Sequence, residues 1–287
     1  MELKNLFIDG CKQLQTIVYN KLQEHEIYNT DVYRNRIKRE LDEIREQDLS
    51  AYMLFLYDFV NKLKENGIGY SPRGIHYTSL FISYLLGIIE FNPLSFDLDI
   101  VSSKRNIIEL DTDGSPEIIC KILAQYDKNR IFRKAFRCQD LSYETNEYQF
   151  LITEKPLCPD FNAAVIDAVK KDTFCEKDTG NHIEIFIPYQ LMVKKIKMLE
   201  AKIGIVDYGD FNDKKVYEYI GSHSLPYPSA LSFKRIQAEK PTNLLSLAKC
   251  PHMPNDPIPT KSQLAHWLCE AIKYYKIAYL KCFYLDS

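Results

Sequence analysis

The chain contains the stretch Ile108-Glu109-Leu110-Asp111-Thr112-Asp113, which places an acidic residue at every second position. Side chains two apart on a β-strand point to the same face, so this pattern predicts a strand from Asn106 to Asp113 that presents carboxylates side by side. Such a face can bind hard cations such as Mg²⁺. Taken alone, the pattern is also typical of a strand that runs into a polar turn, and Gly114-Ser115-Pro116 supplies that turn.

The regions on either side of this strand predict a mixture of strands and helices. Apolar runs with strand-like alternation predict two further strands, at Glu147 to Thr153 and His182 to Pro188. Between Leu3 and Leu63 apolar residues recur at three and four positions, which predicts amphipathic helices that Gly67 ends. The remaining helices are predicted at Gln190 to Lys202, Lys214 to Ile220, Ser229 to Gln237, Asn243 to Lys249 and Ser262 to about Tyr284. The expected fold class is therefore α+β.

Composition limits the protein class. With 46% hydrophobic residues the chain can bury a core, and its formal net charge of -2 means that any groove for nucleic acid must be local. Eight cysteines without a Cys-x-x-Cys pair predict a reduced, cytoplasmic protein. No zinc is expected, because Cys250-Pro251-His252 offers too few ligands. No membrane span is expected, because the apolar run Leu80 to Ile89 is too short.

A loop with an arginine leads into a predicted helix ahead of the acidic strand. The segment Gly69 to Gly74 contains Pro72, and an apolar helix is predicted from Thr78 to Leu86. A helix N-terminus after such a turn can hold an anion, and Arg73 could pair with a phosphate there. The alternative interpretation is a capped helix entrance with a surface arginine.

Several short blocks of sequence follow one another along the chain in an order that can be compared with known families. Arg36 to Ile44 reads RIKRELDEI, Lys64 to Ile68 reads KENGI, Asn92 to Leu94 reads NPL, and Ala278 to Lys281 reads AYLK. With Ser71-Pro72-Arg73-Gly74 and the acidic strand between them, these blocks resemble the palm and fingers of the bacterial DNA polymerase III alpha subunit, the C family of DNA polymerases. The resemblance spans about residues 33 to 284.

The resemblance implies a polymerase-beta-like nucleotidyltransferase palm, a small mixed sheet flanked by many helices. It divides the chain into an N-terminal helical part at residues 1–68, a palm-like core with a reduced thumb at 69–205, and a reduced, helical fingers-like region at 206–287. Two Mg²⁺ or Mn²⁺ ions would serve nucleotidyl transfer there. Asp111 is a ligand in either possible register, with Glu109 in one and Asp113 in the other. Glu184 takes the place of the third carboxylate, although it could equally be an exposed glutamate on an edge strand.

Two further sets of residues follow from the resemblance. The triphosphate would meet Arg73, Gly74, Ser79, Lys273 and Lys276, the last two of which lie near one face of the final helix. DNA phosphates would meet the basic stretch beside the palm, with Lys128, Arg130, Arg133, Lys134 and Arg137. For any single lysine, a solvated surface is the alternative.

Two functions follow from these residues. The first is metal-dependent nucleotidyl transfer, most concretely template-directed DNA synthesis from deoxynucleoside triphosphates. The second is a non-catalytic relative that keeps the palm as a scaffold for DNA or for replication or repair proteins. Three retained acidic positions favour the first. The degraded glycines of the phosphate loop, a conservative but displaced third carboxylate and the mild negative charge favour the second.

Overall fold

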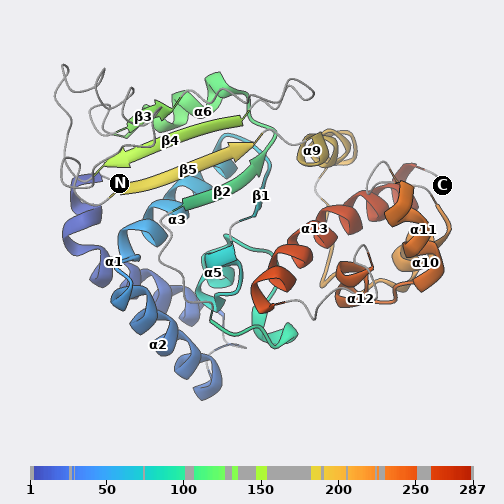
Figure 1. Cartoon of the computed structure of the whole chain (residues 1–287), viewed down its shortest axis with the longest axis horizontal. Coiled ribbons are helices and arrows are strands. Elements are labelled where there is room, and N and C mark those ends of the chain that lie inside the picture. Colours follow the sequence, from blue (N-terminus) through green and yellow to red (C-terminus); the bar gives the residue numbers. More distant parts are fainter. Residues whose placement is uncertain are drawn as a thin grey trace.

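A five-stranded mixed sheet forms one half of the molecule (Figure 1). The computed structural model describes residues 3–25, 28, 30–73, 75–100, 107–126, 131–134, 147–153, 182–188, 191–204, 206–223, 225, 230–250 and 260–285. The strands lie in the order β1-β2-β5-β4-β3, with β2 and β5 parallel and the other neighbours antiparallel. Their bounds are β1 (Tyr70–Pro72), β2 (Ile107–Thr112), β3 (Ile131–Lys134), β4 (Glu147–Thr153) and β5 (His182–Pro188).

The three predicted strands are confirmed as β2, β4 and β5. β1 and β3 were not predicted from the sequence. β1 has three residues and includes a proline, which is too short for an alternating pattern to appear. β3 coincides with part of the basic stretch, whose charges hide its strand character.

Three helices precede the sheet: α1 (Leu3–Glu24), α2 (Asp31–Glu46) and α3 (Ser50–Glu65). α3 buries one continuous apolar side that includes Phe55, Phe59 and Val60, as the amphipathic pattern predicts. The helix ends before Gly67, whose φ of 68° is in the left-handed region that favours glycine. The chain then turns directly into β1, so Gly67 determines where the arginine-bearing loop begins.

The predicted single helix from Thr78 to Leu86 is wrong. The chain instead forms two short helices, α4 (Ile75–Thr78) and α5 (Phe81–Leu85), with a break between them. At the break, Glu40 on α2 accepts hydrogen bonds from the backbone N–H groups of Phe81 and Ile82, both at 2.8 Å. A side chain from another helix therefore fixes the start of α5, which no local pattern encodes.

The C-terminal part is helical, as predicted. Figure 1 shows α10 to α13 grouped beside the sheet-bearing half. α13 also packs against β1, α4 and α9, which brings its middle turns to the sheet. The remaining helices of the described residues are η2 (Pro93–Phe96), α6 (Pro116–Leu123), α9 (Leu191–Ile203), α10 (Lys214–Ser222), α11 (Ala230–Glu239), α12 (Leu244–Lys249), α13 (Lys261–Leu280) and the π-helical turn η4 (Lys281–Leu285).

One hydrophobic cluster joins the described parts of the chain. It includes Phe59 of α3, Ile108 of β2 and Tyr275 of α13, so it joins residues from all three parts expected from the sequence. The division of the chain into those three parts stays a prediction. Within the described ranges, no helix combines the length and the apolar character needed to cross a bilayer.

Candidate functional site

Asp111 of β2 lies at the centre of a buried charge cluster. Its side chain has no exposed surface, and its Oδ2 accepts a hydrogen bond from Nζ of Lys273 on α13 at 2.7 Å. Nη1 of Arg73, just after β1, lies 3.5 Å from the other carboxylate oxygen. The structure thus brings together Arg73, Asp111 and Lys273, which the sequence analysis assigned to one site. The side chain bound directly to Asp111, however, is a lysine.

Lys273 is held by two carboxylates. Its Nζ also donates to Oε1 of Glu270, one helical turn earlier, at 2.6 Å, and the lysine is 3% exposed. Burial alone would lower the pKa of Lys273, but the charges of Asp111 and Glu270 outweigh burial and leave that pKa raised. Burial raises the pKa of the Asp111 carboxyl more than Lys273 and Arg73 lower it. Lys273 is therefore held in its charged form, as the cation of a desolvated ion pair.

β1 positions the arginine. β1 pairs antiparallel with β2 so that Pro72 lies opposite Leu110, and the Arg73 N–H donates to the Glu109 carbonyl at 2.9 Å. The Tyr77 hydroxyl donates to the same carbonyl. These two hydrogen bonds hold the arginine-bearing loop against the acidic strand.

A histidine completes the cluster on α13. His266 is four residues before Glu270 and seven before Lys273, which places all three on one side of the helix. Burial lowers the pKa of His266, and its Nδ1 is buried without a hydrogen-bond partner among the described residues. The imidazole is therefore favoured in its neutral form beside Arg73 and Lys273.

Asp113 has a backbone role. Its Oδ1 accepts the Gly69 N–H at 2.8 Å, and the Asp113 N–H donates to the Gly69 carbonyl. The neighbouring Thr112 hydroxyl donates to the same carbonyl at 2.9 Å. The carboxylate at position 113 therefore holds the entrance of β1 rather than joining Asp111.

Replacing Asp113 with alanine is expected to lower the free energy of unfolding by about 1.5–3 kcal/mol, because a hydrogen bond to a charged acceptor is lost from the β1–β2 ribbon. Urea denaturation measures the change. Asp113→Asn keeps an acceptor oxygen and should recover most of the loss. An asparagine variant as weak as the alanine variant would contradict the backbone role.

The sheet register separates Glu184 from Asp111. On β5, Glu184 lies opposite Ile107, and Phe186 lies opposite Glu109. Ile107 is four residues before Asp111, a separation of about 13 Å along a strand. This backbone register gives no support to Glu184 as a ligand of an ion shared with Asp111, and its role as a metal ligand stays a prediction. The side chain of Glu184 lies outside the described residues.

The start of α5 is filled by an acid from within the protein, whereas an anion site where the Gly69–Gly74 loop enters α4 stays a prediction. The Glu40 carboxylate occupies the start of α5, and Nε of Arg36 lies 2.5 Å from it. Nη2 of Arg36 donates to the Ser79 carbonyl at 3.1 Å. The Ser79 side chain has no exposed surface in this structure, and its contact with a triphosphate stays a prediction. Gly74 lies outside the described residues.

Lys276 does not join Lys273 at Asp111. Its Nζ lies 2.6 Å from Oε2 of Glu90 and 4.9 Å from the ring centroid of Tyr208. The two lysines are three positions apart on α13, as predicted, but they bind different acids. A triphosphate would have to displace a carboxylate from each of them.

Two of the five predicted DNA-contacting residues lie on a described strand. Arg133 and Lys134 lie on β3, where the structure describes the backbone alone, and Lys128, Arg130 and Arg137 lie outside the described residues. Their role in binding DNA stays a prediction.

The described side chains do not fit a two-metal site. Oδ2 of Asp111 is occupied by an ammonium group, Oδ1 of Asp113 by a backbone N–H, and the β5 glutamate is out of register. Across the described part of the chain, no group of three or more His, Cys, Asp or Glu side chains could hold a metal ion. Mg²⁺ needs several oxygen ligands in near-octahedral geometry, so binding at Asp111 would require Lys273 to withdraw.

Two acidic residues that bind site residues or fix a helix start, Glu270 and Glu40, were not predicted from the sequence. A spacing signal was present for both, because Glu270 is three residues before Lys273 and Glu40 is four after Arg36. Spacing alone could not indicate that Lys273 and Arg36 are buried, and burial strengthens such pairs relative to pairs on the surface.

Two comparisons connect this chain with known proteins. The family model described as the bacterial DNA polymerase III alpha NTPase domain matches residues 12–171, more than half of the chain. The DNA polymerase III subunit alpha of Ureaplasma parvum is 33% identical over 210 residues, which cover 70% of this chain and 20% of that protein. The chain therefore spans about a fifth of the length of that relative.

Other relatives match shorter segments. The DNA polymerase III subunit alpha of Helicobacter pylori is 31% identical over 110 residues, or 35% of this chain and 9% of the relative. The Staphylococcus aureus protein of the same name is 35% identical over 88 residues, or 30% of this chain and 8% of the relative.

Proposed function

Because this chain belongs to the family of the bacterial DNA polymerase III alpha NTPase domain, we propose that it is a non-catalytic relative, a scaffold in DNA replication or repair. One observation carries the proposal: Lys273 neutralises Asp111, the residue on which every metal-ligand assignment depends. DNA and other replication or repair proteins are the proposed partners, and the bacterial cytoplasm is the proposed location.

The energetics of the ion pair support this proposal. Removing Lys273 from Asp111 leaves a carboxylate with no exposed surface whose remaining cation, Arg73, lies 3.5 Å away, and breaking a buried pair costs up to about 3–5 kcal/mol. A divalent ion at Asp111 would have to offset that cost. The pair therefore favours a structural use of the acidic strand, in which β2 is joined to the final helix.

Nucleotidyl transfer is the second candidate, and a specific observation favours it. Arg73, Asp111 and Lys273 come from three distant segments and still meet at one point. An acid flanked by two cations from a loop and a helix is also an arrangement that a triphosphate and a metal ion could remodel together. In that case Lys273 would leave Asp111 for a phosphate when the substrate binds, and template-directed DNA synthesis would follow.

Manganese binding and primer extension separate the two candidates. For the scaffold, Mn²⁺ titration followed by electron paramagnetic resonance should show no site in the wild type that Asp111→Asn removes. Primer extension with Mg²⁺ and deoxynucleoside triphosphates should not exceed that of Asp111→Asn. Extension by the wild type that falls at least tenfold in Asp111→Asn would reject the scaffold proposal and favour the enzyme.

Substitution of Lys273 tests whether its ammonium group competes with a metal ion for Asp111. Lys273→Met removes the ammonium group, so Mn²⁺ should bind this variant more tightly than the wild type. Lys276→Met is the matched control, because it removes a lysine of the same helix that does not contact Asp111. Circular dichroism checks that both variants are folded. Equal Mn²⁺ affinity of folded Lys273→Met and the wild type would contradict the inference that Lys273 competes with metal.

A further inference from the structure

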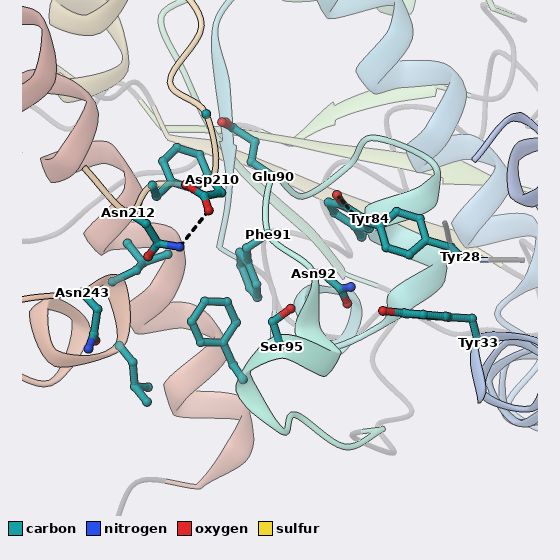
Figure 2. Close-up of a pocket in the computed structure, with 15 residues that line it drawn as sticks. Tyr28, Tyr33, Tyr84, Glu90, Phe91, Asn92, Ser95, Asp210, Asn212 and Asn243 are labelled. Atoms are coloured by element: carbon teal, nitrogen blue, oxygen red, sulfur yellow. Dashed lines mark hydrogen bonds between the residues drawn. The ribbon is translucent and has the colours of Figure 1, made fainter. Parts of the chain in front are cut away.

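A pocket of about 660 Å³ opens between the N-terminal helices, the η2 loop and the C-terminal helices. Figure 2 shows Tyr28, Tyr33 and Tyr84 together on one side, with Asp210 and Asn212 on the opposite side. Neither Asp111 nor Lys273 is among the described residues that line it. The pocket is therefore a second candidate site, separate from the charge cluster.

Aromatic rings form much of the wall. Tyr28, Tyr33 and Tyr84 are half-buried, so part of each ring faces the opening, and Phe96 is half-buried on the η2 side. The hydroxyls of Tyr28 and Tyr84 are hydrogen-bonded to each other at 3.0 Å, which holds these two rings in place. Fixed aromatic faces of this kind favour a flat ligand that can stack.

Two asparagines supply hydrogen-bond donors. Oδ1 of Asn92 accepts the Leu94 N–H at 3.0 Å, and Oδ1 of Asn243 accepts the Ser246 N–H at 2.8 Å. Because an acceptor must face a backbone N–H, these contacts fix which end of each amide is oxygen. The amide NH₂ groups of both side chains are left to donate to a ligand.

Asn212, Asp210 and Glu90 supply hydrogen-bond acceptors. Asn212 donates its NH₂ group to Oδ2 of Asp210 at 2.9 Å, as Figure 2 shows, which leaves the Asn212 carbonyl oxygen available. The Asp210 carboxylate, which is exposed, and the Glu90 carboxylate add further acceptors, although Glu90 is shared with Lys276. No lysine, arginine or histidine is among the described residues of the lining, so nothing there favours a phosphate.

We propose that this pocket binds a nucleobase, with the phosphates of its nucleotide or strand outside. A base is flat and carries both donors and acceptors on its edge, which matches the amide donors of Asn92 and Asn243 and the acceptors of Asn212 and Asp210 around the same pocket. A guanidinium group is also flat, but it only donates, so it would face the NH₂ groups of Asn92 and Asn243 without an acceptor to offer them.

The base can belong to a free nucleoside or to a DNA strand. A strand as the source rests on the proposed function, whereas the base itself rests on the pocket alone. Titrating the full chain with adenosine, cytidine and thymidine, followed by NMR, tests the base. Titrating it with single-stranded dA10 and dT10, followed by fluorescence anisotropy, tests the strand. Arginine amide is the competing probe.

A blocking variant connects binding to this pocket. Ser95 is exposed and points into the pocket in Figure 2, so Ser95→Trp should fill it and weaken adenosine binding at least about tenfold. Ser222→Trp, at an exposed serine on α10 that does not line the pocket, should bind as the wild type does. Asn212→Ala keeps the cavity open but removes an acceptor, and it should weaken binding to a smaller extent.

Each outcome decides something. Nucleoside binding that Ser95→Trp abolishes supports the base pocket, and oligonucleotide binding with the same sensitivity identifies a strand as the source. Failure of every nucleoside and oligonucleotide to bind, equal binding by wild type and Ser95→Trp, or binding of arginine amide alone would overturn the proposal. Asn212 pairs with Asp210, whereas Asp111 and Lys273 pair with each other, Arg73 and Glu270, so such a failure leaves the metal and primer-extension tests of the proposed function unaffected.

Discussion

Glutamine in place of Glu40 should lower the free energy of unfolding by about 3–5 kcal/mol. The wild-type carboxylate is completely buried, pairs with Arg36 and accepts two backbone N–H groups at the start of α5. Glutamine has a single acceptor oxygen, so its NH₂ group would face an N–H donor, and the Arg36 guanidinium would keep the exposed Asp99 carboxylate, 3.7 Å away, as its remaining counter-charge. Because small domains are stable by only about 5–15 kcal/mol, much of the folded population is at risk.

Chemical denaturation of three variants tests this expectation. Glu46→Gln, at an exposed position on the same helix, should change the free energy of unfolding by less than about 0.5 kcal/mol. Arg36→Gln combined with Glu40→Gln should be less destabilising than the sum of the two single changes, because each single change leaves a buried charge without its nearest partner. Full stability of Glu40→Gln would mean that α5 begins without help from α2.

The second large effect is expected at the ion pair between the sheet and the final helix. Asp111→Asn should destabilise the chain by about 3–5 kcal/mol, because Lys273 would keep its charge at 3% exposure with Glu270 as its remaining partner. Lys273→Met should cost a similar amount, because the buried Asp111 carboxylate loses its 2.7 Å partner and keeps the more distant Arg73 as its cation, beside the half-buried Glu270. Urea denaturation at neutral pH measures both.

The double variant reveals whether the two residues act as a pair. Asp111→Asn together with Lys273→Met removes both charges at once and should recover a substantial part of the combined loss. Lys276→Met again serves as the control lysine, since it contacts Glu90 instead. Strictly additive single changes would show that the 2.7 Å contact contributes no coupling of its own.

Local patterns were sufficient to predict the strands whose apolar residues alternate and the helices whose apolar residues recur at helical spacing. β4 and β5 have the predicted bounds, and α10, α12 and α13 begin within a residue or two of the predicted positions. Capping residues explain part of this accuracy, because Asp213, Asn243 and Thr260 each bond to the first turn of a C-terminal helix. Such signals are local, so a single sequence contains them.

Tertiary contacts decided what the sequence could not. The break between α4 and α5 depends on Glu40, which lies about forty residues upstream, and no periodicity indicates it. The carboxylates of Asp111 and Asp113 come from neighbouring positions of the predicted strand, but they have different partners: the ammonium of Lys273 and the Gly69 N–H. The alternation of a strand indicates which side chains share a face, whereas the partners on that face come from other segments.

The distance in sequence between the two ends of the central ion pair has a consequence for biosynthesis. Asp111 and Lys273 are 162 residues apart. At ribosomal rates of about 5–20 residues per second, β2 is made roughly 8–32 s before its counter-charge. During that interval the strand has no ammonium group with which to bury its carboxylate, so the nascent sheet cannot close over Asp111. The native arrangement of β2 is therefore completed after translation has reached the final helix.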